Sequence, residues 1–451
     1  MITIKSEKVR WGISAVLALL ILLGTYRNVF SLAAFLIFGM MLVFCDKETN
    51  LQQIFFVMPM ANIFKLAPGV QSFFTIIILV YVVLHLVLPR QATTVVVMFS
   101  AYIVISQLWE GNFDLFRTIK LICNLLFLSS TLNGEVRFKH KDIFLSFIVG
   151  NILSSFFGMM DSQLFKIQSY VGAKALSQGY GFGDDIVRFA GLYIDPNYYS
   201  IGLIISLCLV VILYHRDEIN SFVLLIFTVP LVYFLVMTYS KSAIIMLIVP
   251  AFFFVYSSMR KHKRMELGIF FATVSILAVL IVAEKIPAMN IIMTRLTEID
   301  SENLDLNEAT TGRFDLWITY SKYIFKNIGT ALFGRGIGAD LLVEHASHNT
   351  YIDIIYFLGA VGGVLLLTSL GIILKQSVQT RVKRNSMNYS VMICIGIMYF
   401  FLGELFYFDP PFQIFIAFMV LNLPLGVAKK SESKALLESE NLNSKRGNSL
   451  K

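Results

Sequence analysis

The chain has 451 residues, of which 57% are hydrophobic and 15% are charged, and it carries a formal net charge of +8. Soluble domains carry about 25% charged residues, so the composition excludes an ordinary soluble domain and predicts an integral membrane protein. The positive charge does not call for a nucleic-acid partner, because the cytoplasmic loops of membrane proteins are themselves enriched in Lys and Arg.

Apolar segments that are long enough to cross a bilayer recur along the sequence. A transmembrane helix needs about 20 apolar residues, and by this criterion we expect about 12 to 14 spans. The candidates lie at 11–26, 28–45, 51–67, 70–88, 93–109, 116–132, 143–160, 197–214, 219–239, 241–258, 266–283, 349–374, 387–404 and 410–427. The first and third are the weakest. The third contains Pro59, Asn62 and Lys65, which predicts a re-entrant or broken segment.

The four cysteines lie inside these apolar runs and show no Cys-x-x-Cys spacing. We interpret them as small core residues rather than as disulfide partners or metal ligands. They are Cys45, Cys123, Cys208 and Cys394.

The distribution of Lys and Arg predicts the orientation of the chain. A cytoplasmic N-terminus places most of the 37 Lys and Arg residues on the inner side, as the positive-inside rule requires. A shift by one helix would place the basic run at 260–264 outside. The preferred topology gives a transmembrane domain at 1–428, with outer loops at about 161–196 and 284–348. The polar segment 429–451 is predicted to be a disordered cytoplasmic tail.

The first outer loop ends with Arg188 and the run Asp195-Pro196-Asn197. Proline suits the first turn of a helix, and Asp195 is predicted to be its N-cap. Arg188 is either an interfacial anchor or a functional cation. Lys241 lies between two apolar runs with almost no linker, where an ionisable group is either functional or paired, or extends to the interface.

The second outer loop contains Arg313, the segment Trp317–Phe325 and a glycine-rich run at 334–338. Apolar residues at helical spacing predict an amphipathic helix that lies on the outer leaflet. Arg313 is either a surface charge at the start of this helix or a functional cation. The run Gly334-Arg335-Gly336-Ile337-Gly338 lacks the features of a nucleotide-binding loop, and it predicts a tight turn with close backbone approach.

His348 precedes Asn349 at the start of an apolar helix. The positive end of the helix dipole favours a neutral imidazole, which can accept a proton from a hydroxyl group. The nearby His345 does not complete a His-Glu-x-x-His zinc pattern, and no third ligand is evident. Between an ordinary interfacial histidine and a catalytic one, we favour the catalytic role, without a metal.

These motifs occur in a particular order: Arg188…Asp195-Pro196-Asn197, Ser240-Lys241, Gly312-Arg313…Trp317, Leu332-Phe333-Gly334-x-Gly336-x-Gly338 and Ser347-His348-Asn349-x-Tyr351…Gly359. The series resembles the O-antigen ligase and polymerase superfamily of bacterial membrane glycosyltransferases, and most of all the Wzy-type polymerases of O-antigen, capsule or exopolysaccharide. The resemblance covers about 188–363 by motif and the whole chain by topology. Lys241 departs from the arginine that this family often has, and it lacks the bidentate fork of a guanidinium group.

The resemblance implies an all-α polytopic membrane protein that is similar to C-type glycosyltransferases, with a large outer loop that contains an amphipathic helix. It implies polymerisation of undecaprenyl-diphosphate-linked oligosaccharide repeat units at the outer face of the bacterial cytoplasmic membrane, with release of undecaprenyl diphosphate. The reaction is expected to invert the anomeric centre and to use no cofactor or metal. The expected partners are the lipid-linked glycan donor and acceptor and membrane lipid, with a chain-length regulator and a flippase as further candidates and no nucleic acid.

The resemblance also implies roles for individual residues. The expected catalytic residues are His348, Arg313 and Arg188, and the expected substrate-binding residues are Lys241, Asn197, Asn349, Tyr351 and Arg335. Guanidinium groups match the geometry of a diphosphate leaving group and stabilise the charge that grows on it. His348 would take the proton of the acceptor hydroxyl or position the acceptor.

Two other functions are compatible with these residues. A ligase that transfers polysaccharide to another acceptor would have a nearly identical site. A flippase for the lipid-linked oligosaccharide would instead line a path through the bundle with charges and repeat its helices between two halves. The sequence shows neither feature, and we favour the polymerase.

Overall fold

The computed structural model describes residues 6–85, 90–132, 140–171, 188–260, 312–343, 347–377, 386–402 and 412–421. Within these ranges every regular element is helical, as the composition predicts. Three helices are long and apolar enough to cross a membrane: α7 (His140–Met159), α9 (Pro196–His215) and α17, over Thr350–Lys375. The predicted span at 266–283, residues 284–311 of the second predicted loop, His345 and the tail at 429–451 lie outside the described residues.

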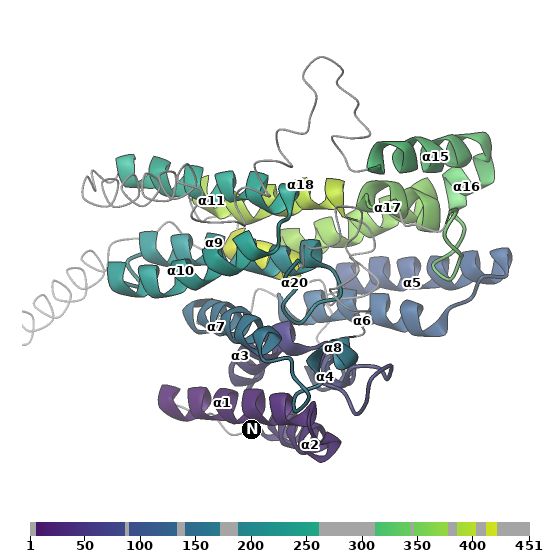
Figure 1. Ribbon diagram of the computed structural model, residues 1–451. Helices are drawn as coiled ribbons and strands as arrows, with labels where there is room; N and C mark the ends of the chain where they lie inside the picture. Colours follow the sequence, from purple (N-terminus) through teal and green to yellow (C-terminus); the bar gives the residue numbers. More distant parts are fainter. Residues whose placement is uncertain are drawn as a thin grey trace, which may run out of the picture.

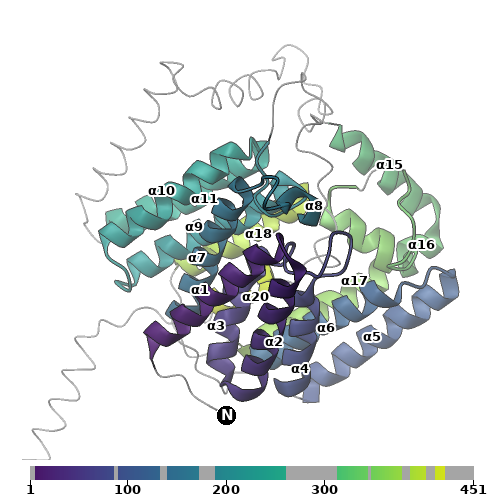
Figure 2. The same cartoon turned by 60° about the horizontal axis from the view of Figure 1, so that its bottom comes forward.

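The described helices pack side by side into one bundle, and most of them run along a common direction (Figures 1 and 2). The others are α1 (Glu7–Gly24), α2 (Asn28–Phe44), α3 (Lys47–Val57), α4 (Phe73–His85), α5 (Arg90–Glu110), α6 (Leu115–Thr131), α8 (Ile167–Val171), α10 (Ser221–Met237), α11 (Lys241–Arg260), α15 (Arg313–Lys326), α16 (Ile328–Phe333), the full α17 (Thr350–Ser377), α18 (Ser390–Phe401) and α20 (Phe412–Leu421). Short 3₁₀ turns occupy Met58–Met60 and Ser386–Tyr389.

Helix α9 lies at the centre of the bundle. Its spanning window is 89% buried, against 44% for that of α17, because α9 packs against α7, α10, α11 and α18. Small residues allow the close approach: a side chain at Gly202 would overlap Asn151 Oδ1 of α7 at 2.5 Å. A helix that is packed on all sides holds the residues at its first turn in one place. The predicted site residue Asn197 lies in that turn, and Arg188 lies in the segment before it.

The third predicted span is broken, as the sequence predicts. Helix α3 ends at Val57, and the 3₁₀ turn that follows contains Pro59, whose nitrogen has no proton to donate. Beyond the turn, Asn62 donates through Nδ2 to the carbonyl oxygen of Leu192 at 2.9 Å. This bond attaches the broken segment to the chain just before α9.

The first helix carries a buried ion pair. Arg10 Nη2 lies 2.9 Å from Asp142 Oδ2 on α7, and Nη1 lies 3.5 Å from Glu48 Oε1 on α3, while the Arg10 and Asp142 side chains are only 5% and 11% exposed. Gln53 of α3 donates to the carbonyl oxygen of Arg10 and accepts from Ser14. These polar contacts attach a weakly apolar helix to two neighbours.

The four cysteines are buried and form no disulfide. Cys208 of α9 and Cys394 of α18 lie 3.7 Å apart between their Sγ atoms. This is a packing contact, because the sulfur atoms of a disulfide are about 2.05 Å apart.

Replacement of Arg10 by alanine should destabilise the bundle by about 3–5 kcal/mol, because it leaves the carboxylate of Asp142 buried without its partner. The thermal unfolding of the purified protein in detergent measures the effect. The control is Arg216→Ala, which removes a more exposed ion pair with Glu218, where the side chains are 21% and 25% exposed and where a loss of about 1 kcal/mol or less is expected. Equal losses in the two variants would contradict the prediction.

Candidate functional site

The start of α9 is built as the sequence predicts. Asp195 caps the helix by accepting a hydrogen bond from the backbone N–H of Asn197 at 2.6 Å, and Pro196 occupies the first turn. A side-chain oxygen at the N-cap satisfies one of the backbone donors that the first turn leaves without a partner. The cap therefore directs the Asn197 side chain toward the segments that precede α9 and α11.

Arg188 and Asn197 form the centre of a small polar network. Arg188 donates through Nε to the carbonyl oxygen of Thr238 at 3.0 Å and through Nη2 to Asn197 Oδ1 at 3.1 Å. Ser240 donates through Oγ to the same Asn197 oxygen at 2.8 Å. These bonds join the segment before α9, the first turn of α9 and the connection between α10 and α11. The two bonds that Arg188 donates fix the orientation of its guanidinium plane.

The connection between α10 and α11 is only a few residues long. Tyr239 adopts a left-handed backbone with φ of 47°, and Ser240 Oγ accepts from the backbone N–H of Ala243 at 3.3 Å. The turn places Ser240 against Asn197. Lys241 is the first residue of α11, and its side chain lies outside the described part of the structure.

Arg313 begins α15, the helix that the sequence predicts over Trp317–Phe325. Gly312 precedes it with φ of 79°, a conformation that glycine adopts without strain. Burial lowers the pKa of the half-buried Arg313 guanidinium from its ordinary value, while electrostatic interaction with Asp195 and, to a lesser extent, with Tyr198 raises this pKa in opposition. A guanidinium group remains charged under such shifts. Arg313 is therefore a partly desolvated cation near the start of α9, where Arg188 also lies.

His348 occupies a strained turn. It is half-buried and has φ of 52°, a left-handed backbone that costs a residue with a side chain about 1–2 kcal/mol. The residue before it is held firmly, because Ser347 donates through Oγ to Asp353 Oδ1 at 2.6 Å. Strain that is maintained by buried hydrogen bonds is typical of functional positions.

Asn349 caps α17. Its Oδ1 accepts hydrogen bonds from the backbone N–H groups of Tyr351 at 3.0 Å and Ile352 at 3.2 Å. The Tyr351 hydroxyl donates to the carbonyl oxygen of Gly396 on α18 at 3.2 Å. In this structure both predicted substrate-binding side chains thus make contacts that hold α17, and their role toward a substrate stays a prediction.

The end of α18 contacts both α15, which begins with Arg313, and the start of α17, which follows His348. The Trp317 ring of α15 packs edge-on against Phe400, with the ring centroids 4.9 Å apart, and Thr350 at the start of α17 donates to the carbonyl oxygen of Leu402. Helix α18 also packs against α9 and α11. The elements that carry Arg188, Arg313 and His348 therefore share one end of the bundle. Arg188 donates a hydrogen bond to Asn197. Arg313 interacts electrostatically with Asp195. His348 precedes a helix whose first residue, Thr350, bonds to the end of α18, and α18 packs against α9.

The glycine-rich run makes the predicted tight turn and fills a break in α17. At Gly359 the helix is interrupted by φ of 67° and ψ of 177°. The backbone N–H groups of Arg335 and Gly336 donate to the carbonyl oxygens of Tyr356 and Phe357 at 2.8 and 3.0 Å. A Cβ atom at Gly359 would lie 2.4 Å from the backbone nitrogen of Gly334, so the two backbones meet where only glycine fits.

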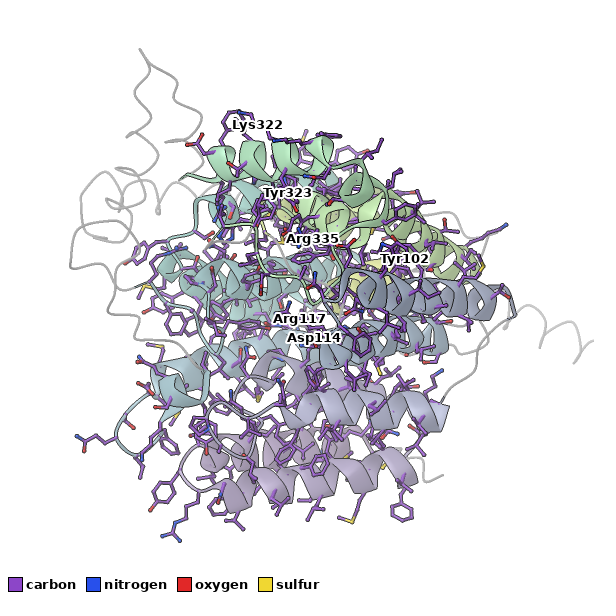
Figure 3. The ribbon with its side chains drawn as sticks, turned by 90° about the vertical axis from the view of Figure 1, so that its right-hand side faces the viewer. Tyr102, Asp114, Arg117, Lys322, Tyr323 and Arg335 are labelled. Atoms are coloured by element: carbon purple, nitrogen blue, oxygen red, sulfur yellow. The ribbon has the colours of Figure 1, made fainter. Side chains whose placement is uncertain are left out.

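Arg335 stabilises this junction (Figure 3). Its Nη1 donates to the Tyr323 hydroxyl of α15, and its Nε lies 3.7 Å from Glu110 Oε2 of α5. Arg117 of α6 donates to the carbonyl oxygen of Ile337 at 3.2 Å. In this structure Arg335 makes contacts within the protein, and its role toward a substrate stays a prediction.

Sequence reasoning did not identify Tyr102 of α5. Its hydroxyl lies 2.6 Å from the carbonyl oxygen of Leu358 and 2.9 Å from that of Phe333, so it bridges the two backbones beside the glycines. The local signal was the set of glycines in the apolar run of α17, Gly359, Gly362 and Gly363, which indicates close approach of another segment but does not say which segment approaches.

No family model, curated protein or solved structure matches this chain. Among the described residues, no three His, Cys, Asp or Glu side chains gather as metal ligands would. The described groups at this end of the bundle include two arginines, a histidine and the amide and hydroxyl groups around them.

Replacement of Gly359 by alanine should destabilise the protein by at least about 2 kcal/mol, because the left-handed backbone alone costs about 1–2 kcal/mol and the new Cβ overlaps the backbone of Gly334. Thermal unfolding in detergent measures the loss. Gly371→Ala is the matched control in the same helix, since no heavy atom lies within 4 Å of its added Cβ, and it should be neutral or stabilising by up to about 1 kcal/mol. If both variants behaved alike, the close approach of the two backbones would be wrong.

Proposed function

We propose that this chain is a polytopic glycosyltransferase of the bacterial cytoplasmic membrane. It joins undecaprenyl-diphosphate-linked oligosaccharide repeat units into a surface polysaccharide at the outer face and releases undecaprenyl diphosphate. The observation that carries the proposal is that Arg188 bonds to Asn197 in the first turn of α9 while Arg313 interacts electrostatically with Asp195, the cap of the same helix, so that a diphosphate group there would find two guanidinium groups.

The distribution of basic residues supports the proposed orientation. Arg10 and Lys47 lie at the first turns of α1 and α3, and Arg216 and Arg260 lie at the ends of α9 and α11. In Figure 1 these helix ends lie at the opposite end of the bundle from the starts of α9, α11 and α15. A basic end is expected to face the cytoplasm, which directs the two arginines outward.

The proposed reaction is a single displacement. A hydroxyl oxygen of one lipid-linked repeat unit attacks the anomeric carbon of the growing chain. The bond between that carbon and the diphosphate oxygen breaks, and its electron pair leaves with undecaprenyl diphosphate. The hydroxyl proton passes to the imidazole of His348. Attack opposite to the leaving group inverts the anomeric centre.

The arginines would act on the leaving group. Negative charge grows on the diphosphate oxygen as the bond breaks, and donors that are already oriented stabilise that charge without reorganising. Arg188 is oriented by its bonds to Thr238 and Asn197. Partial burial of Arg313 lowers the local dielectric constant, and this strengthens its attraction to an anion.

Removal of these groups should abolish polymerisation. In a deletion strain that is complemented with Arg188→Ala, Arg313→Ala or His348→Ala, we expect long chains to disappear while single repeat units remain. The expected fall in rate is about 100- to 1,000-fold for each arginine, the size of effect seen when one donor to a developing anion is removed. Gel electrophoresis of the surface polysaccharide measures chain length.

Lys326→Ala serves as the control for that experiment, because Lys326 is an exposed cation in the last turn of the same helix α15. It should leave chain length unchanged. Normal chain lengths in all three site variants would show the assignment to be wrong. Loss of polysaccharide attachment to its final acceptor, with long chains still formed, would instead indicate a ligase.

Replacement of Asn197 by aspartate tests whether Arg188 serves an anionic ligand. The new carboxylate would form a charge-assisted hydrogen bond with Arg188 and compete with a diphosphate for it. Polymerisation by the purified protein in lipid nanodiscs should fall by at least about tenfold, a change of 1.4 kcal/mol, while thermal unfolding stays near that of the unmodified chain. Full activity in Asn197→Asp would show that Arg188 only stabilises the fold.

A further inference from the structure

Asp353 is a buried acid in the first turn of α17, the helix that follows His348. The residue is only 2% exposed. Within the described ranges Asp142 is the other buried acid, and Arg10 pairs with it. A buried carboxylate is costly unless it is paired or hydrogen-bonded. The first turn of a helix favours a negative charge, and the contacts of the Asp353 side chain indicate what else the carboxylate does there.

Ser347 connects this carboxylate with the turn that contains His348. Ser347 Oγ lies 2.6 Å from Asp353 Oδ1 and 3.0 Å from the carbonyl oxygen of Asn349. A hydroxyl group has one proton to donate, and the shorter distance to a charged acceptor assigns that proton to Asp353. The same Oγ accepts from the backbone N–H of Asn349 at 3.0 Å. The serine hydroxyl therefore joins Asp353 to both residues that flank His348.

These bonds hold the backbone on both sides of His348. Ser347 and Asn349 are buried, and the backbone N–H of Asp353 donates to the carbonyl oxygen of Asn349 at 2.9 Å. His348 between them has φ of 52°, a value that few residues other than glycine adopt. Free movement of the two flanking residues would let this angle return to the ordinary negative range. The bond between Ser347 and Asp353 opposes that change.

We propose that Asp353 is a positioning residue, which holds His348 in its left-handed turn through Ser347 and so orients the imidazole toward the acceptor hydroxyl. This inference rests on the proposed function, in which His348 accepts the proton of that hydroxyl. Asp353 itself neither touches the substrate nor takes a proton. Its effect is large because a reacting group that is misplaced by about 1 Å can lose about 100-fold in rate.

Two substitutions of similar size separate the hydrogen bond from packing. Asp353→Asn keeps an oxygen that accepts from Ser347, and Asp353→Leu has none. The full chain in lipid nanodiscs is supplied with the lipid-linked repeat unit extracted from the deletion strain, and kcat and KM are measured. In Asp353→Leu, kcat should fall by about 10- to 100-fold. KM should change by less than about twofold, because the orientation of a base matters only in the transition state. In Asp353→Asn, kcat should stay within about threefold of the unmodified protein, because the hydrogen bond remains.

Two further variants complete the experiment. Ser347→Ala removes the same hydrogen bond from its other end, and it should show the same fall in kcat. It keeps the test decisive if thermal unfolding shows that Asp353→Leu does not fold. Asp340→Leu is the control for the loss of an acid, since Asp340 is exposed, and it should leave both kcat and KM unchanged.

Unchanged kcat in both Asp353→Leu and Ser347→Ala would overturn the positioning role. A raised KM with unchanged kcat would also overturn it, because it would indicate a contact with the substrate. Equal losses in Asp353→Leu and Asp353→Asn would show an effect of charge and contradict the role of the hydrogen bond. His348→Ala in the same assay separates the two proposals. Full kcat in that variant would remove the proposed base, and this inference would fail with it. Loss of activity there, with both bond variants fully active, would overturn this inference alone.

Discussion

The arrangement of the bundle end that carries Arg188, Arg313 and His348 depends on one close approach of two backbone segments. Gly334 and Gly359 meet at a distance that leaves no room for a Cβ atom on either, and Tyr102 bridges the carbonyl groups beside them. The contact holds the interruption of α17 against the loop that follows α15 and α16. Because the first half of α17 follows His348, and α15 begins with Arg313, the same contact limits how far these two residues can move relative to each other.

The second constraint is the burial of α9. A helix that is packed on all sides cannot shift, so the cap at Asp195 and the bonds of Asn197 place Arg188 reproducibly. Burial of a cation is costly, and the charged Arg313 is stabilised by the carboxylate of Asp195. An anionic substrate would add to that stabilisation, and this supports the proposal that the partly desolvated arginines act on a diphosphate leaving group.

The proposed function describes an amphiphilic substrate, with a diphosphate head and a hydrocarbon chain. Its head would lie between the two arginines. The contacts of Trp317 with Phe400 and of Thr350 with Leu402 connect α15 with the start of α17 through α18.

The sequence alone determined the helical, apolar character of the chain, the cap at Asp195, the break at Pro59 and the tight turn at the glycine-rich run. These features depend on hydropathy, helix periodicity and backbone preferences, which act within a few residues. Only the tertiary structure decided that Arg335 bonds to Tyr323 and Glu110, that Arg10 pairs with Asp142, and that Gly334 meets Gly359. Each of these joins elements that are distant in sequence, and local patterns carry no information about which distant partner a side chain or a glycine will meet.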